Sequence, residues 1–217
     1  MRPPHRHRAH RQPDAGHRLR QQPQAGAAGP LRAVDIDAVP LTPTFVAPAS
    51  AEMQAAVAAL RTRTPLGTTD MHKAVSATIS SFDGKELTAD RARSAVYIGD
   101  GMSLGGLVAS AEMQQGVDQL VAKQISVNSF AVGPRVDAQL LGVLANHTGG
   151  MLLVDSENLN GKQFGGYLAQ GATGAVAWPT KVSLPDSVTE FYPKHFPPLR
   201  FDRDTVVIGS GNPLSSL

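Results

Sequence analysis

Residues 94–101 read Ser-Ala-Val-Tyr-Ile-Gly-Asp-Gly, a short apolar run that closes on an acidic residue between two glycines. Such a run, bounded by charged Arg93 and by Gly99, is typical of a strand buried in a parallel sheet. Gly101 allows the backbone to turn tightly directly after Asp100. Because ligands of open α/β sheets bind outside the carboxyl ends of the strands, Asp100 is predicted to lie at a ligand-binding edge.

Helical and strand patterns alternate on both sides of this run. Apolar residues at helical spacing predict helices that begin near Ser50, Asp70, Ser110 and Asp137, with a further helix around residues 164–168. Strands are predicted over residues 32–37, 125–132 and 151–154, and a left-handed helix cap at Gly149-Gly150. We therefore expect an α/β fold with a Rossmann-like open, mostly parallel sheet and helices on both faces.

Composition divides the chain into three parts. Residues 1–30 hold six Arg and a single acid, a net charge of +5, with no aromatic or β-branched residue, which predicts a disordered basic tail. Alternatives for this tail are a phosphate-binding arm, a histidine metal tract, or residues foreign to the natural protein. Residues 31–172 are expected to form a partial globular domain. Residues 175–217, where strand patterns at 176–184, 188–192 and 205–208 are separated by prolines, predict a β-rich extension.

Charge and composition also exclude several classes of protein. The chain outside the tail carries a net charge of −3, so we do not expect nucleic acid as a partner. No apolar run approaches the roughly 18 residues that span a bilayer. The sequence has no cysteine, which excludes disulfides, thiolate metal sites and cysteine nucleophiles without indicating a compartment.

A second loop, Thr64-Pro-Leu-Gly-Thr-Thr-Asp70, opens one of the predicted helices. The Thr69 hydroxyl and the Asp100 carboxylate are hard oxygen ligands of the kind that Mg²⁺ and Ca²⁺ prefer. Simpler roles are open for both loops: Asp100 can bond to its own turn, and Thr69 or Asp70 can cap the helix, which leaves the other free. Ser103 adds a further hydroxyl near Asp100, although a turn role is favoured.

Enzyme signatures are absent from the sequence. No GxSxG, HExxH, P-loop or EF-hand pattern occurs, and the glycines after residue 98 do not have GxGxxG spacing. His72 and His147 have no partner acid or nucleophile at a telling spacing, so we interpret them as structural. The alternative is a Mg²⁺-dependent phosphohydrolase that uses Asp100 as ligand or nucleophile. Against it, the sequence has no second acidic cluster and no lysine at a phosphate-like spacing.

The two loops, with the order of the elements around them, resemble a von Willebrand factor type A (VWA) domain. That family carries a metal-ion-dependent adhesion site built from an Asp-x-Ser-x-Ser loop, a Thr at a helix start and an Asp-Gly after a strand. Residues 67–70 are similar to the second of these loops and residues 97–101 to the third. The resemblance covers about residues 31–172, most specifically 61–155, and implies Thr69 and Asp100 as metal ligands.

One part of the family pattern is missing from this chain. No Asp has Ser at both the second and the fourth following position, so the Asp-x-Ser-x-Ser loop is absent. We expect a VWA domain truncated at its N-terminus, without the first strand and helix, whose degenerate site binds Mg²⁺, Ca²⁺ or Mn²⁺ weakly. The resemblance implies a non-enzymatic module that engages an acidic side chain of a partner protein through the cation. An inactive structural fragment is the remaining alternative.

Overall fold

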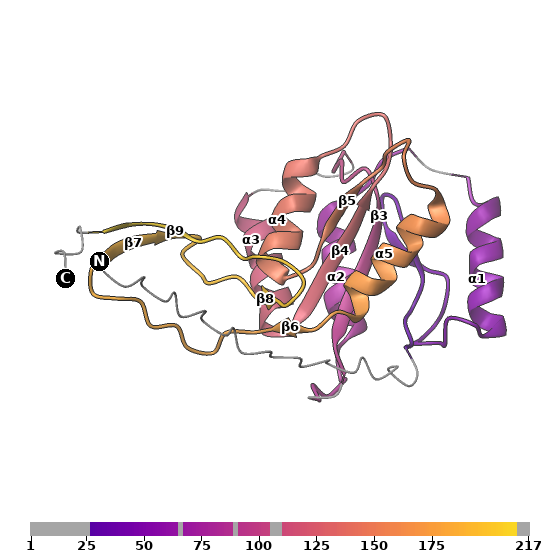
Figure 1. The fold of residues 1–217 in the computed structure, drawn as a ribbon. Helices are drawn as coiled ribbons and strands as arrows, with labels where there is room; N and C mark the ends of the chain where they lie inside the picture. Colours follow the sequence, from indigo (N-terminus) through magenta and orange to yellow (C-terminus); the bar gives the residue numbers. More distant parts are fainter. Residues whose placement is uncertain (1–26, 65–66, 89–90, 105–109, 212–217) are drawn as a thin grey trace, which may run out of the picture.

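A three-stranded parallel sheet forms the centre of the computed structural model, which describes residues 27–64, 67–88, 91–104 and 110–211. Its strands are β3 (Arg93–Gly99), β4 (Ile125–Ala131) and β5 (Leu152–Val154), in the order β3-β4-β5 (Figure 1). The predicted α/β fold is thereby confirmed. Most of the predicted tail, residues 1–26, lies outside the described residues.

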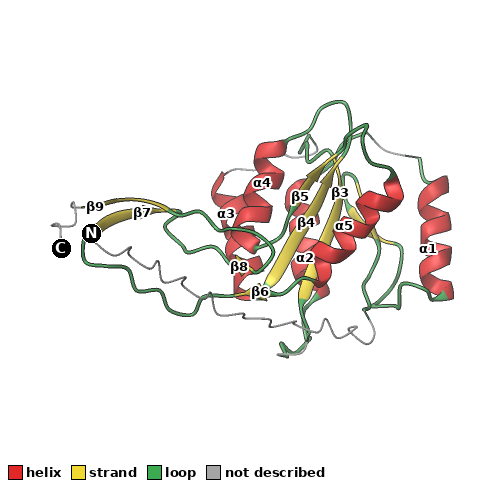
Figure 2. Cartoon of the chain, in the orientation of Figure 1, coloured by secondary structure: helices red, strands yellow, loops and turns green. Residues whose placement is uncertain are grey.

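Helices cover both faces of this sheet (Figure 2). α2 (Met71–Ser81), α3 (Ser110–Ala122) and α4 (Ala138–Thr148) pack on one face, and α5 (Gly161–Thr173) packs on the other. Each helix begins close to its predicted position. α1 (Ala51–Thr62) lies to one side of the sheet in Figure 1, capped by Ser50, whose hydroxyl accepts from Met53 N at 3.1 Å.

The central strand β4 divides its side chains between the two faces by simple alternation. Val127 and Ala131 belong to the main core with α2, α3 and α4. On the opposite face Phe130 stacks on Phe164 of α5, with ring centroids 4.4 Å apart. The main core is apolar and made of the following buried residues: Met71, Ala74, Val75, Ile79, Met113, Val117, Leu120, Ile125, Val127, Ala131, Leu141 and Leu144.

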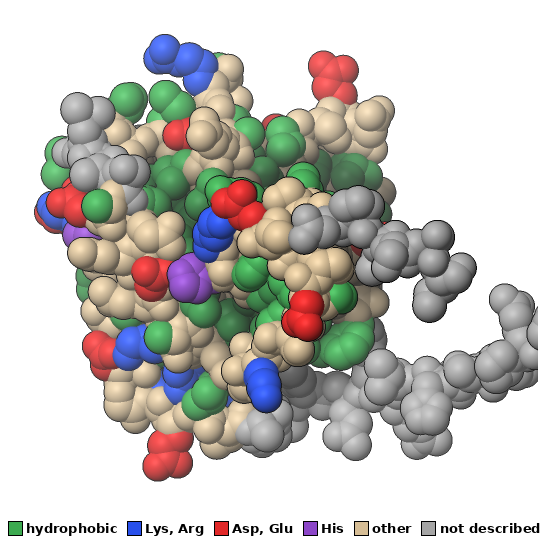
Figure 3. Space-filling view, turned by 90° about the vertical axis from the view of Figure 1, so that its left-hand side faces the viewer, with side chains coloured by type: hydrophobic (Ala, Val, Ile, Leu, Met, Phe, Trp, Pro, Cys, Tyr) green, Lys and Arg blue, Asp and Glu red, His purple; other side chains and the backbone are tan. Residues whose placement is uncertain are grey.

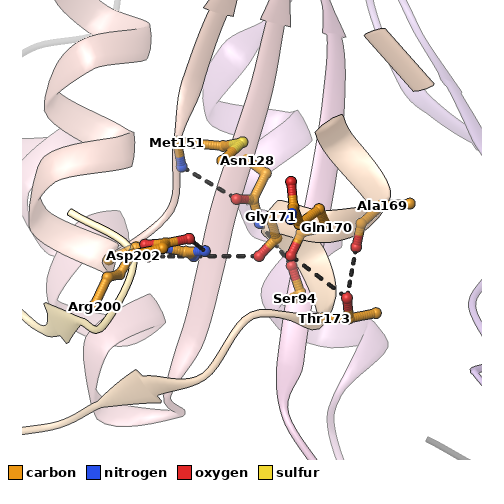
Figure 4. A network of polar contacts seen from close by, with 10 residues as sticks. Ser94, Asn128, Met151, Ala169, Gln170, Gly171, Thr173, Arg200 and Asp202 are labelled. Atoms are coloured by element: carbon orange, nitrogen blue, oxygen red, sulfur yellow. Dashed lines mark hydrogen bonds and ion pairs between the residues drawn. The ribbon is translucent and has the colours of Figure 1, made fainter. Parts of the chain in front are cut away.

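A buried amide ties the three strands together (Figure 4). The Asn128 side chain on β4 donates to Ser94 Oγ on β3 at 2.8 Å. It accepts from Met151 N, just before β5, at 3.1 Å. Since Asn128 is fully buried, both bonds are needed to satisfy its polar atoms.

The N-terminal strand is shorter than its pattern predicts. β1 (Arg32–Val34) and β2 (Ala38–Pro40) form an antiparallel hairpin, and residues 35–37 make the turn between them. Asp37 N donates to Asp35 Oδ1 at 3.3 Å, a side-chain bond that favours the turn over an extended strand. The prediction of one strand over residues 32–37 was therefore wrong in its second half.

Beyond α5 the described residues 176–211 contain strands and no helix. β6 (Val176–Ala177) pairs with β8 (Leu199–Arg200), and β7 (Val188–Tyr192) pairs with β9 (Ile208–Gly211), both antiparallel. The predicted strand at 188–192 is confirmed. The predicted strand over 176–184 stops after two residues, shortly before Pro179, which has no N–H for a sheet bond. The strand predicted at 205–208 begins only at Ile208.

Arg200 fixes this last segment to the rest of the chain (Figure 4). Its guanidinium donates to the carbonyls of Gly149 and Gly171, each at 3.2 Å, and to both carboxylate oxygens of Asp202 at 2.8 and 2.6 Å. The side chain is 1% exposed. Within the part of the chain that the structure describes, no helix is long and apolar enough to cross a membrane.

Candidate functional site

The two predicted loops meet at the carboxyl ends of the strands. Thr69 forms an isolated parallel bridge with Ser103, four residues after β3 ends. Met71 N, the first residue of α2, donates to Ser103 Oγ at 3.1 Å. Ser103 therefore holds the start of α2 against the loop that contains Asp100.

Of the two candidate caps of α2, Asp70 takes this role. Its carboxylate accepts from Lys73 N at 3.0 Å, which satisfies one of the unpaired amides of the first helical turn. Thr69 is half-buried, and the residues described by the structure form no hydrogen bond to its hydroxyl. The capping role therefore belongs to Asp70 and not to Thr69.

Asp100 makes the simple turn bond that its sequence also allowed. One oxygen, Oδ1, accepts from Met102 N at 3.0 Å. Gly101 follows at φ +75°, and a Cβ there would lie 2.8 Å from the Cγ of buried Leu141, so glycine is required. A carboxylate has a second oxygen and further lone pairs, so the turn bond does not use up its capacity as a ligand.

Asp100 lies between the start of α4 and the Tyr97 side chain. Its carbonyl accepts from Asp137 N at 2.8 Å, and Asp137 caps α4, so the positive end of this helix lies beside the Asp100 loop. On the other side, the Tyr97 hydroxyl accepts from Gly101 N at 3.2 Å. Burial raises the pKa of Tyr97, and the Asp100 charge adds to this effect, so the phenol stays neutral.

Asp35 also lies at this edge of the sheet, and the sequence analysis does not predict it there. Its carbonyl accepts from Asp70 N at 2.8 Å, which brings the end of β1 to the same edge. The residue is 7% exposed, and its carboxylate binds the Arg63 guanidinium at 2.6 Å. The sequence holds one signal for this, an acidic residue within the run 32–37, but the alternating pattern of that run predicts a continuous strand and hides the turn.

The Asp35–Arg63 pair makes stability depend on pH. The Arg63 hydrogen bond, helped by the bond from Asp37 N, lowers the pKa of Asp35 below its ordinary 3.8. A carboxylate with a lowered pKa stabilises the folded state above its unfolded pKa, and this contribution is lost as the pH falls through the folded pKa. Asp35→Asn is therefore expected to lower the urea midpoint near neutral pH. The difference in midpoint from the parent chain should become smaller as the pH falls below about 4.

The matched control is Glu157→Gln, because Glu157 is exposed and has no ion pair among the described residues. Urea titrations of both variants and the parent chain at about pH 6 and about pH 3 measure the effect. An Asp35→Asn deficit that stays constant between the two conditions would contradict the assignment.

The ligand set at this edge is small. No group of three or more His, Cys, Asp or Glu side chains that could hold a metal occurs among the described residues. Asp100 and Thr69 offer one carboxylate and one hydroxyl, while Asp35 is held by Arg63. Mg²⁺ takes six oxygens in near-octahedral geometry, so these residues fit a cation only if water or a partner completes its shell.

Comparison with known proteins assigns the family. The sequence profile of a family described as von Willebrand factor type A domain matches residues 30–153, from before β1 into β5. This chain belongs to the von Willebrand factor type A family. VWA domains are in general non-enzymatic adhesion or interaction modules.

A solved structure shares the fold of this VWA domain. It is described as "von Willebrand factor type A from Catenulispora acidiphila", with a TM-score of 0.61 and 15% sequence identity over 86% of this chain and 45% of that one. A manganese-loaded TRAP protein from Plasmodium vivax gives a TM-score of 0.42 and 14% identity, over 55% of this chain and 46% of that one. The chain thus spans less than half of either solved protein. No curated protein matches it.

Proposed function

We propose that this VWA domain binds a partner protein at the carboxyl edge of its sheet, through a divalent cation held by Thr69 and Asp100. The observation that supports the proposal is the bridge between Thr69 and Ser103, a residue three positions after Asp100. An acidic side chain of the partner would supply the charge that the domain lacks. The domain is not expected to catalyse a reaction.

The charge of the chain is in keeping with a protein partner. Figure 3 shows one face of the molecule, on which basic and acidic side chains lie among neutral and apolar ones, in places next to one another. A phosphate backbone requires a basic surface, whereas the chain outside residues 1–30 carries a net charge of −3. The proposal therefore retains a protein, and not a nucleic acid, as the partner.

We also propose that residues 31–172 form the VWA unit and residues 175–217 a separate β-rich extension. In support, α5 ends at Thr173, and the described residues beyond it form only short antiparallel pairs. The basic tail over residues 1–30 remains a proposal from composition, because residues 1–26 are outside the described part of the chain.

Metal binding by the isolated chain is expected to be weak. Titration with Mn²⁺ should broaden the amide NMR signals of residues 69–71 and 100–103 with an apparent Kd of about 1 mM or weaker, because the site offers few protein ligands. Asp100→Ala should abolish this localised broadening. N-acetylglutamate, a mimic of the partner's side chain, should raise the apparent affinity for Mn²⁺, because two ligands that share one site stabilise each other's binding.

The control variant is Asp118→Ala, which removes an exposed carboxylate on α3 that accepts from Gln114 Nε2 at 2.8 Å. It should leave the broadening unchanged. Broadening that survives Asp100→Ala, or micromolar Mn²⁺ affinity lost in that variant, would contradict the weak site. Turnover of a generic phosphate ester that Asp100→Asn abolishes would favour the phosphohydrolase alternative.

A further inference from the structure

The Tyr97 side chain extends from β3 to the turn that carries Asp100. Tyr97 and Gly99 lie on the same face of β3, because side chains alternate along a strand. The phenol passes over Gly99, since a Cβ built on this glycine would lie 2.6 Å from the Tyr97 hydroxyl oxygen and 3.0 Å from its Cζ. The hydroxyl oxygen accepts from Gly101 N at 3.2 Å. Tyr97 therefore bonds to the backbone on the far side of Asp100.

The core holds the ring of this side chain in place. Tyr97 is half-buried and packs against the main core, as Ala95 does on the same face of β3. Its register partner on β4 is the buried Ser129. A tyrosine side chain has few rotatable bonds, so a ring that is fixed at the core brings its hydroxyl to one place. The hydroxyl oxygen is therefore a fixed acceptor for Gly101 N.

The bond from Gly101 N restrains the peptide unit that joins Asp100 to Gly101. In this planar unit the Gly101 N–H and the Asp100 carbonyl point in opposite directions. The N–H donates to Tyr97, and the carbonyl accepts from Asp137 N at 2.8 Å. Because the unit is bonded on both sides, it cannot rotate without breaking one of the two bonds. The backbone of Asp100 is therefore fixed from β3 and from the start of α4.

The same backbone sets the direction of the Asp100 carboxylate. Its Oδ1 accepts from Met102 N at 3.0 Å, one residue beyond the restrained peptide. On another side, a Cβ built on Gly133 would lie 3.4 Å from the Asp100 Cβ, so the loop after β4 limits the space for this side chain. A cation requires its ligand oxygens in a defined geometry, so the direction of this carboxylate affects how well it can bind one.

We infer that Tyr97 is a positioning residue of the candidate cation site: its hydroxyl oxygen fixes the Asp100–Gly101 peptide and thereby orients the Asp100 carboxylate. This inference rests on the proposed function, because it assigns Asp100 to the cation. Tyr97 itself does not contact the cation in this assignment. Burial raises the pKa of Tyr97 and the Asp100 charge raises it further, so the hydroxyl stays neutral near neutral pH.

Tyr97→Phe tests the inference, because it keeps the ring and removes the acceptor of Gly101 N. Without metal, the Gly101 amide should exchange with solvent about fivefold faster than in the parent chain. Mn²⁺ is then added well below its apparent Kd, where the broadening of amide NMR signals is proportional to occupancy. The localised broadening at residues 100–103 should fall about fivefold, the effect of one hydrogen bond on an equilibrium.

Ala95→Gly is the matched control, since Ala95 lies on the same strand and face but two residues further from the turn. Glycine removes a core contact and weakens the strand, so the urea midpoint should fall. The broadening by Mn²⁺ should nevertheless stay at the parent value. This control separates the positioning of Asp100 from a general loss of stability, and circular dichroism melts check that each variant is folded.

Gly99→Ala tests the same bond without removing the hydroxyl. Its Cβ would overlap the Tyr97 oxygen and should push the phenol away from Gly101 N, which weakens Mn²⁺ binding about as much as Tyr97→Phe does. Combining the two substitutions should add little further loss of Mn²⁺ affinity, because both remove one interaction. Losses that simply add in the double variant would contradict the role of this bond.

The remaining outcomes separate this inference from the proposed function. Equal broadening in the parent chain and in Tyr97→Phe would overturn the positioning role and leave the cation site standing. A parent chain without localised broadening at residues 100–103 would overturn both. A decrease in Ala95→Gly as large as that in Tyr97→Phe would show that stability alone governs Mn²⁺ binding, and would likewise overturn the inference.

Discussion

Gly150→Ala is expected to lower the free energy of unfolding by about 3 kcal/mol or more, a large part of the 5–15 kcal/mol of a typical domain. A Cβ at residue 150 would overlap the carbonyl carbon and oxygen of Val127 and lie 3.0 Å from its nitrogen. These are backbone atoms in the middle of the central strand, so no side-chain rotation can relieve the overlap. The strand and the chain after α4 would have to move apart.

Hydrogen bonds oppose such a movement. Val127 N donates to Thr148 Oγ1 at 2.9 Å, and this hydroxyl donates to the carbonyl of Leu144 at 2.6 Å. Ser129 N also donates to the carbonyl of Met151 at 2.7 Å. All of these groups lie next to Gly150 along the chain or across the sheet, so separating the segments would leave buried polar groups unpaired.

Urea unfolding followed by circular dichroism measures this effect, with Gly142→Ala as the matched control. Gly142 lies inside α4, and a Cβ there meets nothing within 4 Å. This control should be neutral or stabilise the chain by up to about 1 kcal/mol, because alanine favours a helix over glycine. Equal midpoints for the two variants would contradict the close approach of Gly150 to β4.

Arg200→Met is expected to cost about 3 kcal/mol and to release the segment that follows α5. Methionine keeps most of the volume but removes the bonds to the Gly149 and Gly171 carbonyls, which lie in buried surroundings. Each buried polar group left unpaired costs about 1–3 kcal/mol. Asp202 adds little to this loss, because its side chain is half-exposed and water can solvate it.

Two measurements separate a local from a global effect of Arg200→Met. The urea midpoint reports the loss of stability, and hydrogen exchange or limited proteolysis of residues 176–200 reports release of the segment. Arg203→Met is the control, since Arg203 is exposed and donates no hydrogen bond to the described residues. Its expected change in the free energy of unfolding is within about 0.5 kcal/mol. A parent-like midpoint for Arg200→Met would show that the guanidinium does not hold the segment.

Local signals predicted much of the domain. Ser50, Asp70 and Asp137 each cap a helix with their side chains, and the predicted helix starts lie within a few residues of these caps. Gly149 adopts the left-handed conformation that its place after a helical pattern predicted, with φ +67°. Capping and left-handed turns depend on neighbours within a few residues, which is why sequence spacing suffices for them.

The candidate site was predicted in part. The order of strand, turn and helix predicted that Thr69 and Asp100 share one edge of the sheet, and the bridge from Thr69 to Ser103 is in keeping with this expectation. Their roles as metal ligands stay predictions. The contribution of Asp35 was missed, because its bond to Asp70 joins residues far apart in sequence and leaves no spacing pattern.

Two neighbouring glycines, Gly149 and Gly150, show the difference between what the local sequence predicts and what only tertiary packing decides. The conformation of Gly149 follows from the end of its own helix and can be read from the chain alone. The need for glycine at 150 comes from Val127, a strand and a helix away, and becomes visible only when β4 and the chain after α4 pack together. Periodicity and capping therefore determined the helices and the strands of the central sheet, whereas steric contact between distant segments decided which side chains a position such as residue 150 tolerates.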